Sequence, residues 1–118
     1  MMILVDTSVW IQHLRQGNDQ LVTMLEAGEV LCHPFVIGEL ACGMLRNRDE
    51  LLKLLAALPA TPVAEHVEVL SLLSEGGLAG RGLAWIDVHL LASVLLANRT
   101  LWTFDKALAR VAAEFAVN

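Results

Sequence analysis

Short apolar segments alternate along this chain with longer segments whose apolar residues recur at helical spacing. Ile3–Val5, Val30–His33 and Thr100–Thr103 have the length and the apolar character of buried strands. The segments between them carry leucine, valine and alanine three and four positions apart, as one face of a helix requires. This alternation predicts an α/β domain with a short, mainly parallel central sheet and helices on both faces.

Capping residues and glycines place the helices more closely. Pro34 suits the first position of a helix, and Gly28, Gly76 and Gly77 suit helix ends. Thr61–Ala64 could form a further short strand. The predicted helices span about residues 9–15, 21–25, 34–44, 49–58, 67–73, 86–98 and 104–115. A length of 118 residues fits one domain, so we expect a single domain over residues 1–118.

The composition is apolar but not that of a membrane protein. Apolar residues make up 56% of the chain and charged residues 18%, which excludes a disordered chain and implies a substantial core. The longest apolar stretches fall short of the roughly 18 residues that a spanning helix needs, and no secretory signal is visible at the N-terminus. Cys32 and Cys42 match no zinc pattern, so we expect buried free thiols and a cytoplasmic protein.

Four carboxylates occur where apolar segments end or helices begin. Asp6 closes the first strand segment, and Asp105 follows the last one by two residues. Asp87 falls in the first turn of a predicted helix, and Glu39 projects from a largely apolar one. Functional groups of an open parallel sheet collect at the carboxyl ends of its strands, so these side chains are expected to converge there. Carboxylate oxygens are the ligands that Mg²⁺ and Mn²⁺ prefer.

Each of these acids also has an ordinary structural explanation. Asp6, Asp87 and Asp105 could be helix-capping or first-turn acids, and Glu39 could lie on an exposed stripe. Their joint placement favours the metal site. The net charge of −5 does not exclude a phosphate substrate, because the other nine acidic residues nearly balance the eight Lys and Arg.

The segments DTSVWI, GEL, WID and LWTFD, in this order over nearly the whole chain, resemble the PIN-domain ribonuclease toxins of VapBC toxin–antitoxin systems. The resemblance implies endonucleolytic cleavage of RNA with Mg²⁺ or Mn²⁺, leaving 5′-phosphate and 3′-hydroxyl ends, with one or two ions held by Asp6, Glu39, Asp87 and Asp105. It also implies inhibition by a cognate VapB-type antitoxin, and a homodimer.

Several residues beside these acids are candidates for supporting roles. The hydroxyl groups of Thr7, Ser8 and Thr103 could orient Asp6 or Asp105, although capping is an alternative. Arg81, in a glycine-rich segment before Asp87, is the preferred phosphate contact, with an ordinary solvated cation as the alternative.

The aromatic residues and histidines carry no clear functional signal. Trp10, Trp85 and Trp102 could stack on bases, but aromatic residues flanked by aliphatic ones are more often core, so they are left out of the predicted site. The histidines form no ligand cluster, and His89 is expected to point away from Asp87 in a surface or supporting position.

Two other functions remain open at this point. A haloacid dehalogenase-like phosphatase also begins with a strand that ends in Asp, but Ser8 stands where its second Asp would be. A partner-binding module without enzymatic activity would instead use the leucines of the predicted helix 49–58 to bind a partner helix.

Overall fold

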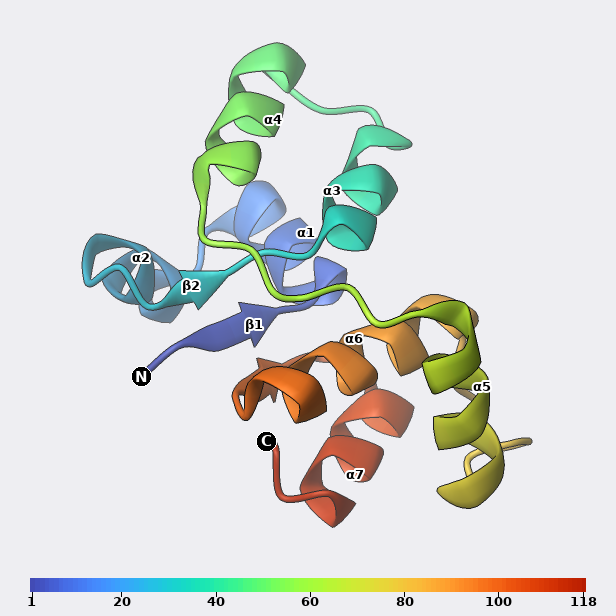
Figure 1. Ribbon diagram of the computed structural model, residues 1–118. Helices are drawn as coiled ribbons and strands as arrows, with labels where there is room; N and C mark the ends of the chain where they lie inside the picture. Colours follow the sequence, from blue (N-terminus) through green and yellow to red (C-terminus); the bar gives the residue numbers. More distant parts are fainter.

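The computed structural model describes residues 1–118 and contains a parallel sheet of three strands with seven helices (Figure 1). The strands are β1 (Ile3–Val5), β2 (Val30–Leu31) and β3 (Thr100–Trp102). The helices are α1 (Thr7–Gln16), α2 (Asp19–Glu26), α3 (Pro34–Ala41), α4 (Arg48–Ala57), α5 (His66–Glu75), α6 (Trp85–Ala97) and α7 (Lys106–Glu114). The predicted fold class, a short parallel sheet flanked by helices, is confirmed.

β1 occupies the centre of the sheet, in the order β2-β1-β3. Leu4 lies opposite Leu31 on one side and Leu101 on the other, and its side chain is fully buried. Because all strands run in parallel, Val5, Leu31 and Trp102 end at the same edge of the sheet. The chain segments that leave this edge include Asp6 and Asp105.

The prediction of a strand at Thr61–Ala64 was wrong. The chain there makes only an isolated parallel bridge between Cys32 and Ala60. Pro59 and Pro62 have no backbone N–H, so a regular ladder cannot form on either side of that bridge.

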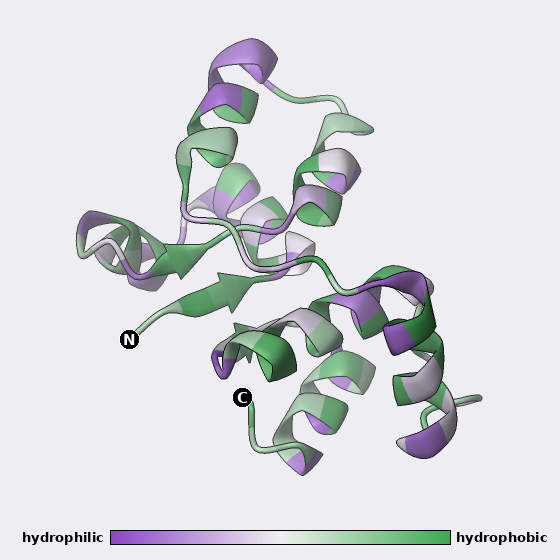
Figure 2. Cartoon of the chain, in the orientation of Figure 1, coloured by the Kyte–Doolittle hydropathy of each residue, from purple (hydrophilic) through white to green (hydrophobic).

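The helices form two groups about the sheet. Figure 1 shows α3 and α4 on one side of β1 and α6 and α7 on the other. α6 is buried continuously from Val88 to Val94, which explains why it lacks a polar face. In Figure 2 the apolar colour runs along β1, while the first turn of α4 is polar. The buried sheet and α6 therefore fix the backbone positions of the acids that follow the strands or begin this helix.

Two smaller differences concern helix ends and thiols. α3 ends at Ala41, short of the predicted residue 44, and α7 begins at Lys106 because Asp105 caps it. Cys42, just past the end of α3, is exposed, contrary to expectation. Cys32 is buried as expected, and burial raises the pKa of its thiol to about 11. None of the helices has both the length and the apolar character that crossing a membrane requires.

Candidate metal centre

Asp6 lies directly after β1 and caps the N-terminus of α1, with only 5% of its surface exposed. Its Oδ2 atom accepts hydrogen bonds of 2.7 Å from the Ser8 hydroxyl and 2.7 Å from the Thr103 hydroxyl. The backbone N–H of Ser8 donates a longer bond of 3.4 Å to the same oxygen. Hydrogen bonds from these three donors stabilise the ionised carboxylate in a buried position.

The Ser8 and Thr103 hydroxyls also bind the loop that carries Asp105. The backbone N–H of Phe104 donates to the Ser8 hydroxyl, and the N–H of Asp105 donates to the Thr103 hydroxyl, each over 3.0 Å. The two hydroxyl oxygens lie 3.3 Å apart. The end of β1 and the loop after β3 are therefore held together by two side chains that the sequence had marked as candidates.

The other three acids are each fixed by one hydrogen bond. Asp105 caps α7, since its Oδ1 accepts from the Leu108 N–H over 2.9 Å. Asp87 Oδ2 accepts from the Ala84 N–H over 2.8 Å at the start of α6. Glu39 Oε1 accepts from the Thr7 hydroxyl over 2.6 Å, which makes Thr7 the third candidate hydroxyl in contact with an acid. Asp6 and Asp105 are therefore helix caps, as the structural explanation proposed, but capping accounts for only one oxygen of each.

These hydrogen bonds use only one oxygen of each carboxylate. Asp6 Oδ1, Glu39 Oε2, Asp87 Oδ1 and Asp105 Oδ2 make no hydrogen bond within the protein. The only salt bridges of the structure, from Met1 to Glu29 and from Arg81 to Glu114, involve none of these acids. Each acid therefore retains an oxygen and a negative charge that nothing in the chain neutralises.

The electrostatics of Asp87 show that the four acids share one region. Burial raises the pKa of this carboxyl, the Ala84 N–H lowers it, and the negative charges of Asp105, Asp6 and Glu39 raise it further. Carboxylates that raise one another's pKa without a basic partner favour a divalent cation. The donor set, oxygen atoms only, fits Mg²⁺ or Mn²⁺. No three acidic, histidine or cysteine side chains lie close enough to hold one ion as they stand, so binding requires the acids to move inward.

Arg81 is not brought to the acids. Its guanidinium group forms a forked ion pair with Glu114, and the Nη1 atom lies 2.9 Å from the glutamate. Glu114 ends α7, whereas Asp105 begins it, and nine helical positions separate them by about 13 Å along the axis. The pairing directs the guanidinium group of Arg81 toward the end of α7 that lies away from Asp105. The neighbouring backbone runs near the start of the same helix, since a Cβ on Gly82 would lie 3.6 Å from the Cβ of Ala107.

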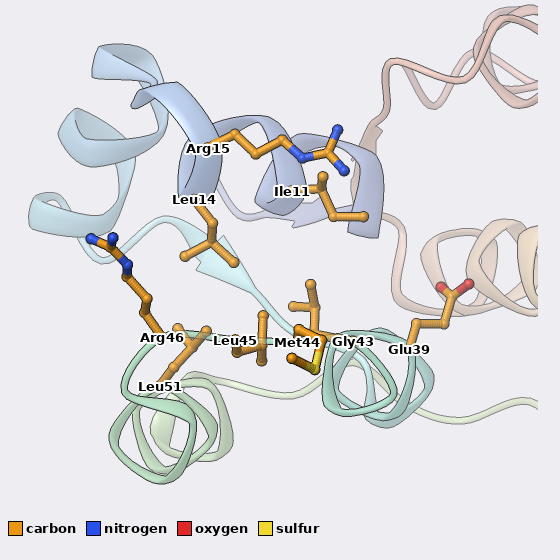
Figure 3. Close-up of a pocket in the computed structure, with 10 residues that line it drawn as sticks. Ile11, Leu14, Arg15, Glu39, Gly43, Met44, Leu45, Arg46 and Leu51 are labelled. Carbon is orange, nitrogen blue, oxygen red and sulfur yellow. The ribbon is translucent and has the colours of Figure 1, made fainter.

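A pocket of about 370 Å³ lies between α1, α3 and α4, beside Glu39. Figure 3 shows Leu14, Leu45 and Leu51 between the helices, with Glu39 at one end and Arg46 at the other. The sequence had suggested a leucine-rich binding surface on α4. The pocket uses Leu51 of that helix, but it also takes Ile11 and Leu14 from α1, which sequence reasoning missed.

The second feature that sequence reasoning missed is the surroundings of Trp85. This residue was expected in the core, yet 37% of its surface is exposed. Its indole contacts His66 and His89, with ring centroids 5.1 and 5.0 Å away. His89 is buried rather than at the surface. The four-residue spacing of Trp85 and His89 on a helix was the available signal.

Four acids around one end of a three-stranded parallel sheet are the arrangement that the sequence comparison can now be set against. The sequence matches the PIN domain family over residues 3–114, and the chain belongs to that family. It is 51% identical to Ribonuclease VapC32 of Mycobacterium tuberculosis, in each of two strains, over 98% of this chain and 94% of the relative. The resemblance to VapC-type PIN domains is thereby confirmed.

Solved structures support the fold independently of sequence. FitAcB from Neisseria gonorrhoeae superposes with a TM-score of 0.69 over 95% of this chain and 94% of its own, at 24% identity. FitAB bound to an IR36 DNA fragment superposes with a TM-score of 0.68 over 95% of this chain and 91% of its own, at 23% identity.

Proposed function

We propose that this protein is an endoribonuclease that depends on Mg²⁺ or Mn²⁺ and is the toxin of a type II toxin–antitoxin module. The observation that carries the proposal is the group of four carboxylates, each with one oxygen free, in a PIN domain 51% identical to a named ribonuclease. The products are a 5′-phosphate and a 3′-hydroxyl.

The chain's own residues hold and orient the site. Asp6, Glu39, Asp87 and Asp105 offer their free oxygens to one or two ions. Ser8 and Thr103 occupy Asp6 Oδ2 with hydrogen bonds, which would leave Oδ1 available to an ion. When bound, the ions supply Lewis-acid chemistry, which activates water and offsets charge on the phosphodiester and on the leaving oxygen. No serine, cysteine or histidine nucleophile is required.

Phosphate contacts fall to cations that are free of ion pairs. Lys106 directly follows Asp105 and forms no salt bridge. It is therefore a better candidate than Arg81, whose charge is already paired with Glu114.

The antitoxin is proposed to occupy the pocket between α1, α3 and α4. The floor of the pocket is apolar, as a partner helix or strand requires, and Glu39 belongs both to its wall and to the group of acids. A segment in this pocket would cover one side of the metal centre. The partner-binding role considered from the sequence thus becomes part of the toxin's regulation rather than a separate function.

We also propose a homodimer that acts in the cytoplasm. Large apolar side chains are exposed on α5 and α6, namely Val67, Leu70 and Leu96 at 67%, 45% and 53%. A surface of this kind is typical of an interface between subunits. A purely monomeric mass in light scattering of the antitoxin-free protein would contradict the dimer.

The central test is cleavage of total RNA by the purified, antitoxin-free protein with Mg²⁺ or Mn²⁺. EDTA and the Asp6→Asn variant serve as controls, and the product ends are mapped by sequencing. Discrete cuts with 5′-phosphate ends that disappear in both controls are expected. Cutting that survives EDTA would contradict the metal mechanism. Hydrolysis of a phosphomonoester without RNA cutting would favour the phosphatase.

A further inference from the structure

A row of four aromatic side chains runs from α3 across α6 to α5. Phe35 and His89 have ring centroids 4.7 Å apart, His89 and Trp85 5.0 Å, and Trp85 and His66 5.1 Å. We call Phe35, His89, Trp85 and His66 the aromatic row. The planes of neighbouring rings cross at 65°, 82° and 52°, so no aromatic ring of the protein lies flat on the indole of Trp85.

Two helices of the row, α3 and α6, also carry two of the four acids, Glu39 and Asp87. Phe35 and Glu39 lie one turn apart on α3, which places them on one face of that helix. Trp85 and Asp87 share the first turn of α6. The aromatic row therefore leads away from the acids toward the surface at the start of α5.

The two members of the row at the α5 end are exposed, whereas the other two are not. His89 is buried, Phe35 is half-buried, and Trp85 and His66 are exposed. By contrast, Trp10 is 4% exposed and belongs to the core. The indole of Trp85 contacts the ring of buried His89 edge to face, so an exposed aromatic residue here rests on a buried one.

We propose that Trp85 and His66 form a stacking platform for an unpaired base of the RNA. This inference rests on the proposed ribonuclease function. Unpaired bases in single-stranded loops can turn outward and stack on aromatic side chains, whereas the bases of a duplex cannot. The platform would therefore favour unpaired RNA over a duplex.

The charges around the platform favour a base over a phosphate. Glu65 and Glu68 flank His66 at the exposed start of α5 and repel the RNA backbone. The contact must be made by a ring face, and its contribution should depend only weakly on salt concentration.

The experiment measures binding in EDTA, so that RNA is not cut. A fluorescein-labelled single-stranded RNA and the same strand in a duplex are titrated with wild-type protein and with the Trp85→Ala, Trp85→Phe and His66→Ala variants. Fluorescence anisotropy gives Kd. Trp85→Ala is expected to weaken binding of the single strand about tenfold. Trp85→Phe should retain most of the affinity, and duplex binding should not change.

Two further measurements keep the inference separate from the proposed function. Single-stranded RNA should quench the tryptophan fluorescence of the wild type more than that of Trp85→Phe. In Mg²⁺ or Mn²⁺, the Trp85→Ala substitution should raise KM and spread cleavage over more positions of the RNA. If the wild type cuts RNA and Trp85→Ala shows the same Kd, KM and cut sites, the platform is excluded while the ribonuclease function stands. If the wild type does not cut RNA at all, the proposed function fails first.

A protein partner on the same surface is the remaining outcome. If Trp85→Ala changes the mass of the protein in light scattering but leaves its affinity for RNA unchanged, the aromatic row is a subunit contact and the inference is overturned. Thermal unfolding of each variant checks that the exposed substitutions leave the fold intact.

Discussion

The Thr103 hydroxyl donates a 2.7 Å hydrogen bond to the Asp6 carboxylate across 97 positions of the sequence. The same hydroxyl accepts a bond from the Asp105 N–H. One small side chain therefore sets the positions of two of the four acids relative to each other.

Replacing Thr103 tests this relationship. Thr103→Val keeps the shape but removes the hydroxyl, so Asp6 and Asp105 lose their common contact. We expect the rate of RNA cleavage to fall about 10- to 100-fold and the free energy of unfolding to fall by about 1 kcal/mol. Thr103→Ser retains the hydroxyl and should stay near wild type. Equal rates for the valine and serine variants would show that the hydroxyl does not position the site.

Asp87 should make metal binding and stability depend on pH. Burial and the neighbouring acids raise the pKa of this carboxyl in the folded state, so ionised Asp87 destabilises the metal-free protein. Asp87→Asn should therefore raise the melting temperature without metal at neutral pH. Because the folded pKa lies above the unfolded one, the folded state takes up a proton first as the pH falls. The difference in melting temperature between Asp87→Asn and the wild type should therefore become smaller as the pH falls.

When metal is bound, ionised Asp87 should stabilise the protein instead of destabilising it. Mg²⁺ or Mn²⁺ should raise the melting temperature of the wild type more than that of Asp87→Asn. Scanning calorimetry at neutral and mildly acidic pH, with and without the ion, gives both comparisons. A melting temperature of the variant that is lower than wild type in EDTA at neutral pH would refute the repulsion.

His33 should weaken the fold in acid. Burial, and to a lesser extent the charge of His89, lower the pKa of this fully buried ring from 6.5 to about 4. The unfolded state therefore binds the proton more readily, and stability is lost as the pH falls from about 6.5 toward 4, by up to about 3 kcal/mol.

A His33→Asn variant isolates that effect. The His33 Nδ1 atom accepts from the Phe35 N–H and caps α3, and asparagine can supply the same acceptor without titrating. The variant should be less stable at pH 7, because the smaller side chain leaves space, but should lose less stability on acidification. Urea unfolding at pH 7 and pH 4.5 measures both quantities. Parallel losses in the two proteins would assign the acid sensitivity to other groups.

The ion pair between Arg81 and Glu114 provides a matched pair of variants. Arg81→Ala and Glu114→Ala break the same exposed contact, so each should lower the free energy of unfolding only slightly and by a similar amount. Only Arg81→Ala removes a positive charge. Because the pair lies at the far end of α7 from Asp105, the two variants should cleave RNA at equal rates. Slower cleavage by Arg81→Ala alone would restore Arg81 as a phosphate contact.

The fold was readable from the sequence because its signals are local. Each strand is a short apolar segment, and each helix has an apolar face or a capping residue. Asp6 and Asp105 were marked by their position after such strands, and parallel topology brings strand ends together. Thr61–Ala64 was wrongly predicted as a strand because Thr61 and Val63 are β-branched, whereas Pro59 before the segment and Pro62 within it prevent a ladder.

The features that the sequence did not reveal depend on partners far along the chain. Arg81 and Glu114 are 33 positions apart, and their pairing occupies the guanidinium group that was expected to contact phosphate. The exposure of Trp85 depends on how α6 packs against α5. Which oxygen of each acid is used by the protein is a matter of three-dimensional geometry, and no residue pattern encodes it.

The bond between Thr103 and Asp6 also bears on when the protein can act. Asp6 is translated near the start of the chain and Asp105 near the end, and central strand β1 acquires its second neighbour only when β3 has been made. A chain whose synthesis has not yet reached β3 lacks both the Thr103 hydroxyl and Asp105, so its four acids cannot be brought together. The site can assemble only after β3 and the loop behind it have left the ribosome.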